Sequence, residues 1–188
     1  MISLINMNTD NAMRRLGIRL LPAVAALAGV AAMAGGCNSV VDDRIPAVPV
    51  TINLSDAGRW NTYGVSGFGI YRYFIRPLHE PSNFPYTDQT YTGFGGVLLI
   101  GGMDPFTADT QVPLAYDLAC PVECRTDVRV RIDENKYEAV CDVCGSRYDV
   151  TMAGGSPVSG PAADGNNKYG LQRYRCEPTA LGGYIITR

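Results

Sequence analysis

Four cysteines in the middle of the chain have the residue type and spacing that a metal site or a pair of disulfides requires. Cys120 and Cys124 form one close pair in "CPVEC", and Cys141 and Cys144 form a second pair in "CDVC". Thiolates presented by tight turns bind zinc, a single iron ion or a [2Fe–2S] cluster, whereas oxidised thiols form disulfides. The spacing of the cysteines leaves these alternatives open.

The segment between the two pairs has the pattern of a β-hairpin. In "DVRVRID", Val128, Val130 and Ile132 alternate with polar residues, as in a strand with one buried face. The turn "DEN" follows, and "KYEAV" leads back to Cys141. Such a hairpin would bring the two cysteine turns together. Because zinc ribbons and rubredoxin-like sites are built in this way, we expect a small cysteine-loop subdomain at about 118–162.

The rest of the chain predicts an all-β domain of short strands. Apolar residues alternate over residues 48–54, and "GGVLLIGG" at 95–102 is an apolar run flanked by glycines. Further segments with strand composition are 69–75, 113–119, 171–177 and 182–188, and the last two predict a closing hairpin. Residues 76–94 predict a long polar and aromatic loop that covers one side of a sheet.

The two cysteine boxes resemble those of a Rieske domain. That family has a first box C-x-H and a second box C-x-x-H-G-S, which often continues with Tyr-Asp and then a Gly-Pro-Ala loop. This chain has "CPV" at 120–122, "CDVCGSRYD" at 141–149 and "GPA" at 160–162. The resemblance covers roughly residues 46–188. It implies an antiparallel β-sandwich similar to the Rieske-like lipoproteins of the bacterial cell envelope.

Both histidine ligands of a Rieske centre are missing from the boxes. Cys120 and Cys141 stand at the two cysteine-ligand positions, but Val122 and Cys144 stand where the histidines should be. The one histidine of the chain, His79, lies well before the first box. The chain therefore does not build a centre with two histidine and two cysteine ligands, and the high potential that histidine ligation confers is not expected.

Four thiols remain as the expected metal ligands: Cys120, Cys124, Cys141 and Cys144. The resemblance places Cys124 near an extra cysteine that forms a disulfide in some Rieske proteins, but Val143 stands at its usual partner's position. Cys124 is then available as a metal ligand, or as a disulfide partner of Cys144 or Cys176. The resemblance thus leaves zinc, iron or a [2Fe–2S] cluster as alternatives to a metal-free scaffold held by disulfides.

Two hydroxyl residues of the second box have a counterpart in the family. Ser146 and Tyr148 match the serine and tyrosine that donate hydrogen bonds to cluster sulfur in respiratory Rieske proteins. The alternative is a structural turn in which Tyr148 belongs to the core and Ser146 bonds the backbone.

The N-terminal region has the layout of a signal peptide that ends at a lipid attachment site. Basic residues at 14–19 precede an apolar run at 20–33 that is too short to cross a bilayer comfortably. The following "AGGC" resembles a bacterial lipobox, in which Cys37 is diacylated. The alternative is an ordinary cleaved signal with an incidental cysteine. We expect a signal peptide over 1–36, with translation starting at Met1 or Met13, and a tether over 37–45.

This layout predicts an extracytoplasmic protein held on a lipid membrane through Cys37. Asn38 after that cysteine, rather than Asp, favours the outer membrane. Outside the cytoplasm thiols tend to oxidise, and zinc needs no cluster assembly before export, so the compartment favours disulfides or zinc over iron. The net charge of −2 without a basic cluster argues against nucleic acid as a partner, which leaves a redox or envelope protein.

We therefore expect a membrane-anchored lipoprotein whose degenerate Rieske-like domain uses its cysteines as a structural staple, through a metal or disulfides. The alternative function is electron transfer through a Cys₄-ligated iron or [2Fe–2S] centre of low potential. We do not expect an enzyme. A Rieske oxygenase needs a further iron-binding domain with two histidines and a carboxylate, and this chain has one histidine.

Overall fold

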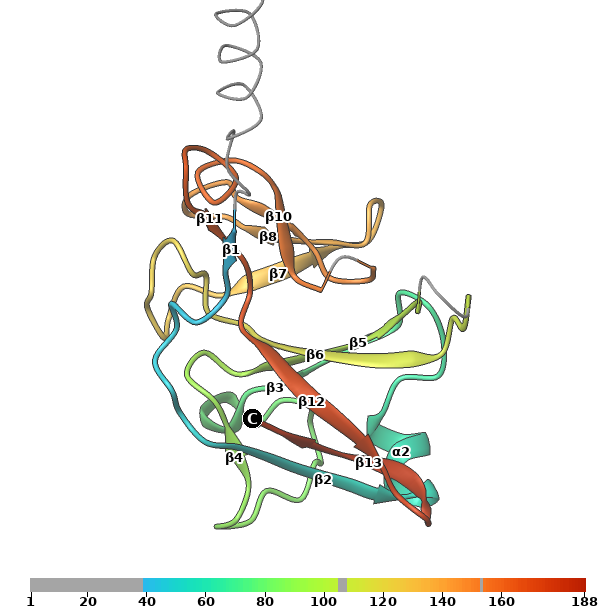
Figure 1. Cartoon of the computed structure of the whole chain (residues 1–188). Coiled ribbons are helices and arrows are strands. Elements are labelled where there is room, and N and C mark those ends of the chain that lie inside the picture. The colour runs from blue at the N-terminus through green and yellow to red at the C-terminus, as the bar shows by residue number, and fades with distance from the viewer. Residues whose placement is uncertain (1–38, 105–107, 153) are drawn as a thin grey trace, which may run out of the picture. The chain divides into compact units, whose positions relative to one another are not determined.

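A nearly closed antiparallel sheet of seven strands makes up the larger part of the structure (Figure 1), a computed structural model that describes residues 39–104, 108–152 and 154–188. The strand order is β3-β5-β6-β12-β13-β2-β4. These strands are β2 (Val50–Asp56), β3 (Tyr71–Phe74), β4 (Tyr91–Thr92), β5 (Val97–Gly102), β6 (Val112–Asp117), β12 (Arg173–Pro178) and β13 (Gly182–Thr187). The predicted closing hairpin is confirmed as β12 and β13.

A separate sheet of four strands carries the second cysteine pair. Its order is β10-β9-β8-β7. The strands are β7 (Val130–Asp133), β8 (Glu138–Cys141), β9 (Arg147–Asp149) and β10 (Ser156–Ser159). The hairpin predicted between the cysteine pairs is confirmed, because β7 and β8 pair antiparallel with Val130 opposite Cys141 and Asp133 opposite Glu138. Two short strands, β1 (Val40–Val41) and β11 (Lys168–Tyr169), pair in parallel.

The alternation of side chains in the large sheet creates two apolar cores, one on each face. Strand β5 is buried at every position, which explains its unbroken apolar run. Leu98 and Ile100 face a first core that the four-stranded sheet closes with residues such as Ile132 and Tyr148. Val97 and Leu99 face a second core with residues of β2 and β13. Both sheets are therefore joined through apolar packing, and Cys120 and Cys141 belong to the first core.

The second core is closed by a short helix and by the predicted polar and aromatic loop. Helix α2 (Ala57–Tyr63) begins after Asp56, whose carboxylate accepts the Arg59 N–H. Residues 76–94 contain the 3₁₀ turn η1 (Arg76–Leu78) and β4, and their Phe84 packs edge-on against Phe74 at 5.2 Å between ring centroids. The loop thus covers one side of the sheet, as predicted from its aromatic residues.

The N-terminal part of the described chain lies against the domain. Ile45 is buried, and the Arg44 guanidinium stacks over the Tyr169 ring at 4.2 Å from its centroid. These residues belong to the segment 37–45 predicted as a tether. The predicted signal peptide and Cys37 fall outside the described residues. Among the described residues, no helix is long and apolar enough to cross a membrane.

Candidate metal centre

Three of the predicted ligands converge at the boundary between the two sheets. Cys120 follows β6, Cys141 ends β8, and Cys144 lies in the turn between β8 and β9. Their three sulfur atoms all lie within 4.8 Å of one another. Cys120 and Cys141 are fully buried, whereas Cys144 is partly exposed. The arrangement is a buried thiol site that reaches solvent on the Cys144 side.

The sulfur spacing fits one tetrahedral ion better than a disulfide. The Sγ atoms of Cys120 and Cys144 are 3.6 Å apart. Zinc–sulfur bonds of about 2.3 Å in tetrahedral geometry place two ligand sulfurs about 3.8 Å apart. A disulfide requires a sulfur–sulfur distance of about 2.05 Å, and none of the three cysteines forms one. The three cysteines can therefore hold a metal ion without a large rearrangement of their turns.

Two buried hydroxyl groups contact the sulfur atoms. The Ser146 Oγ lies 3.1 Å from the Cys144 Sγ, and the Tyr148 hydroxyl lies 3.5 Å from the Cys120 Sγ. The Ala162 N–H donates to the same Ser146 oxygen at 3.0 Å. The Cys144 thiol donates to the Ser146 oxygen, which has a second lone pair besides the one that the Ala162 amide uses, and the serine hydroxyl can donate in return once Cys144 is a thiolate. Both residues predicted to lie around the centre thus contact a sulfur of the three-cysteine group, and Tyr148 also belongs to the core.

The local environment shifts the pKa values of the Cys120 and Cys144 thiols in opposite directions. Burial raises the pKa of Cys120 to about 12, although the Tyr148 hydroxyl and the N–H groups of the following turn partly offset this. At Cys144 burial acts in the same direction, but hydrogen bonds with the Ser146 hydroxyl and amide and with the Cys141 and Cys120 thiols together outweigh it and lower the pKa. A bound cation would favour the thiolate form of both residues.

The loop at 160–162 packs closely on the second cysteine turn. Gly160 has a φ of +79°, and a Cβ atom there would lie 2.9 Å from the Ser146 Cα. Any larger residue would push this loop away from the turn and remove the Ala162 N–H from Ser146. The "GPA" motif therefore holds the hydroxyl that faces Cys144.

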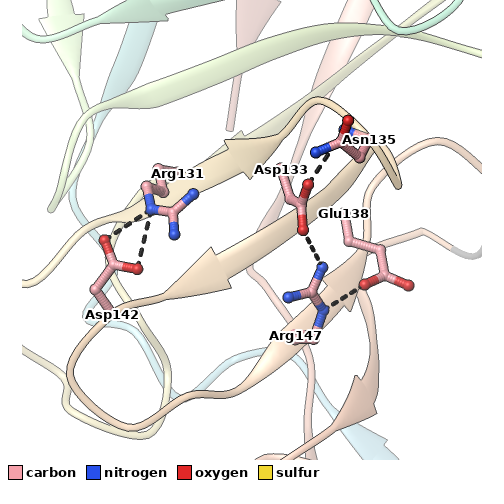
Figure 2. Close-up of polar contacts among 6 residues, drawn as sticks. All are labelled: Arg131, Asp133, Asn135, Glu138, Asp142 and Arg147. Atoms are coloured by element: carbon pink, nitrogen blue, oxygen red, sulfur yellow. Dashed lines mark hydrogen bonds and ion pairs between the residues drawn. The ribbon is translucent and has the colours of Figure 1, made fainter.

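Ion pairs on the outer face of the small sheet brace the hairpin and the second cysteine turn (Figure 2). Arg147 on β9 donates to Asp133 on β7 and to Glu138 on β8, both at 2.5 Å. Arg131 on β7 contacts both carboxylate oxygens of Asp142, which lies between the two cysteines of the turn, at 2.9 and 2.8 Å. These pairs lower the pKa of Asp133 and of Asp142.

A buried carboxylate that the sequence analysis missed anchors the start of the first cysteine turn. Asp117 is fully buried and accepts the Tyr174 hydroxyl at 2.6 Å. It also accepts the backbone N–H groups of Phe94, Gly95 and Ala119 at 2.7 to 2.9 Å. Burial raises its pKa, and these four hydrogen bonds oppose that effect. Only the fold could reveal this role, because the four donors come from three separate segments.

Cys124, predicted as the fourth ligand, does not belong to the group of three thiols. Its Sγ lies 3.1 Å from the Pro121 carbonyl oxygen and 3.9 Å from that of Arg44. Cys176 packs against the second core on the other face of the sheet, where burial raises its pKa to about 12. His79 lies at the end of η1 within the 76–94 loop. The described cysteines are all free thiols.

No protein-family model matches the chain, and no curated protein is significantly similar to it in sequence. The assignment of a function therefore rests on the residues and their geometry alone.

Proposed function

We propose that the protein binds one metal ion, with zinc preferred, through Cys120, Cys141 and Cys144, and that the ion staples the two sheets together. The observation that carries this proposal is the convergence of three thiols from two turns within 4.8 Å. A ribbon-like site of this kind would tie the end of β6 in the large sheet to the β8–β9 turn of the small sheet. The ion would supply coordination bonds that stabilise both turns, with no chemical reaction.

The domain that carries this site is proposed to be a degenerate Rieske-like domain. Two cysteine turns joined by a hairpin, the Gly-Pro-Ala loop against the second turn and the hydroxyls beside the sulfurs support this assignment. A rubredoxin-like or zinc-ribbon-like character of the cysteine loops is part of the same proposal.

We further propose that the protein is an envelope lipoprotein, anchored in a lipid membrane through Cys37. The support is the sequence pattern described above, a basic region and a short apolar run that end in "AGGC". Mass analysis of a membrane-extracted sample tests this proposal directly. Acylation of Cys37 is the expected result, and an unmodified chain that still carries residues 1–36 would contradict it.

Elemental analysis of single cysteine variants tests the metal site. We expect about one zinc per chain in the unaltered protein, and we expect Cys120→Ser, Cys141→Ser and Cys144→Ser each to lose most of it. Cys176→Ser is the matched control, because Cys176 belongs to the other core. Equal metal content in all four variants would refute the proposal.

Electron transfer through iron is the second candidate, and the hydroxyl contacts to sulfur favour it. Hydrogen bonds from Ser146 and Tyr148 to ligand sulfurs would tune the reduction potential of an iron–sulfur centre. A structural zinc ion undergoes no redox reaction, so it has no reduction potential to tune. Visible absorption distinguishes the two candidates, since iron–thiolate centres are coloured and zinc sites are not. A colourless, zinc-loaded protein purified without exposure to oxygen would rule out electron transfer.

A further inference from the structure

The two cysteine turns have the same backbone conformation, although their sequences differ. In the first turn the Cys124 N–H donates to the Cys120 carbonyl at 2.8 Å, and in the second the Gly145 N–H donates to the Cys141 carbonyl at 2.8 Å. The residue at the end of each turn has a positive φ, +50° at Cys124 and +74° at Gly145. The two turns are thus repeats of one knuckle that begins with a buried cysteine.

The repeat assigns each residue of the first turn a counterpart in the second. Cys120 corresponds to Cys141, and the ligand position three residues later holds Cys144 in the second turn but Glu123 in the first. Cys124 corresponds to Gly145, the position that closes the turn. Counting cysteines along the sequence pairs Cys124 with Cys144, whereas the backbone repeat pairs Glu123 with Cys144, because the first cysteine pair is one residue wider than the second.

The contacts of Cys124 agree with this correspondence. A side chain at the closing position leaves the turn in a different direction from the one at the ligand position, and the Cys124 thiol lies against the Pro121 and Arg44 carbonyls. A positive φ strains any residue with a Cβ atom, so a glycine would be easier to place there. Cys124 closes the knuckle and faces away from the three thiols.

The Glu123 carboxylate is not engaged by a neighbouring guanidinium and is therefore available to bind a metal ion. Arg125, the nearest guanidinium along the chain, pairs instead with Asp127 through two contacts of 3.1 and 2.6 Å. Among the described residues, the Glu123 carboxylate has no hydrogen-bond or ion-pair partner. In the structure its carboxylate lies outside the group of three sulfurs. The side chain is partly buried and has three rotatable bonds, so binding at the site would require it to rotate toward the sulfurs.

We propose that the carboxylate of Glu123 is the fourth ligand and that the site is a Cys₃Glu zinc site. This inference rests on the proposed metal-binding function. Zinc accepts carboxylate oxygen together with thiolate sulfur, at about 2.0–2.2 Å. A [2Fe–2S] cluster is held by four thiolates in most proteins, so a glutamate in the fourth position favours zinc over the cluster. With one carboxylate and three thiolates, a Zn²⁺ site would carry a net charge of −2.

Zinc affinity in matched variants of the full chain tests the assignment. The dissociation constant is measured by competition with a chromophoric zinc chelator, and Co²⁺ replaces Zn²⁺ for visible spectra. We expect Glu123→Gln to weaken zinc binding by at least about tenfold, in line with losses seen when a metal site loses a supporting group. Cys124→Ser and Asp127→Asn, neighbours in the same loop, should bind zinc as the unaltered protein does.

A rescue variant separates loss of a ligand from loss of the fold. Glu123→Cys should bind zinc at least as tightly as the unaltered protein, and its Co²⁺ form should show stronger sulfur-to-cobalt charge transfer because a fourth thiolate has been added. Zinc binding weakened by Cys124→Ser but not by Glu123→Gln would overturn the proposal and make Cys124 the ligand. No effect of either variant would overturn it in favour of a solvent ligand. If Cys141→Ser also leaves zinc binding unchanged, the metal-binding function itself fails.

Discussion

The two faces of the large sheet pack against cores that differ in the kinds of side chains they contain. The second core consists of aliphatic and aromatic side chains, closed by α2 and by Phe84 of the 76–94 loop. The first core also contains thiols, hydroxyls and a loop held by a glycine at positive φ. The second core relies mainly on burial of apolar side chains, whereas the first core joins the large sheet to the four-stranded sheet that carries the second cysteine turn. We infer that the ion pairs on the small sheet, together with the proposed metal ion, stabilise the first core.

Among single substitutions, truncation of the second core is expected to have the largest effect on stability. Leu54 is fully buried, and Leu54→Ala should lower the free energy of unfolding by about 3 kcal/mol through lost burial and the cavity left behind. Urea denaturation measures this loss, and it should be equal with and without a zinc chelator because the site lies on the other face. The exposed Val158→Ala is the control, with a change within about 0.5 kcal/mol. A loss that vanishes after chelation would contradict the separation of the two cores.

Removal of the metal should act on the first core alone. A ligand present at a thousand times its dissociation constant stabilises the state that binds it by about 4 kcal/mol, so chelation should lower the free energy for local opening of the small sheet by an amount of this order. Hydrogen exchange after chelation should become faster at the amides of β7, β8 and β9 and stay slow in β2 and β13. Uniform acceleration over both sheets would show that the small sheet does not unfold separately.

Replacement of the buried carboxylate tests the joint between the large sheet and the first cysteine turn. Asp117 accepts four donors, and an amide in Asp117→Asn would turn one NH₂ group toward them and leave buried donors unpaired. We expect a loss of about 2 kcal/mol in unfolding free energy. Tyr174→Phe removes a single donor and should cost less. Equal losses in the two variants would indicate that the backbone donors do not depend on the carboxylate.

Ion pairing on the small sheet should give the smallest effect and a defined pH dependence. The hydrogen bond from Arg147 lowers the pKa of Asp133 below its unfolded value of about 3.9. Its stabilisation is therefore present above about pH 4 and is lost as the pH falls through the lowered folded pKa. Melting temperatures of the unaltered protein and of Arg147→Met, both saturated with chelator to exclude acid release of zinc, should differ at pH 7 and converge near pH 2.

The more exposed pair on the same sheet serves as the control for this prediction. Arg131 and Asp142 have side chains 58% and 62% exposed, against 23% and 22% for Arg147 and Asp133. Arg131→Met should therefore change the melting temperature less than Arg147→Met at pH 7. The reverse order would contradict the view that partial burial makes the Arg147 pairs the stronger brace.

The sequence was sufficient to predict the strands whose side chains alternate and the hairpin between the cysteine pairs. Period-two burial of Val50, Ile52 and Leu54 in β2 and the register of β7 with β8 follow from local patterns of apolar residues. Helix α2 was missed because seven residues are too few to show a helical period. Its only local sign is Asp56, which accepts the Arg59 N–H.

The site was only partly predictable, because local sequence patterns do not contain side-chain directions or long-range contacts. Residue type and spacing identified Cys120, Cys141 and Cys144, since thiols in two turns are recognisable without coordinates. The direction of each side chain depends on the backbone, and the positive φ of Cys124 places its thiol outside the group. Asp117 could not be recognised as a buried acceptor either, because its donors meet only in the folded sheet.

The most direct test of the central claim is the intact mass of the purified protein, measured under native conditions and again after denaturation without a reductant. We expect a single mass increment that matches one zinc ion, disappears on denaturation and leaves every thiol free. A native protein without metal, lighter by two hydrogens for each disulfide formed, would contradict it. That result would make the cysteine turns a disulfide-linked scaffold and remove both the zinc and the iron proposals.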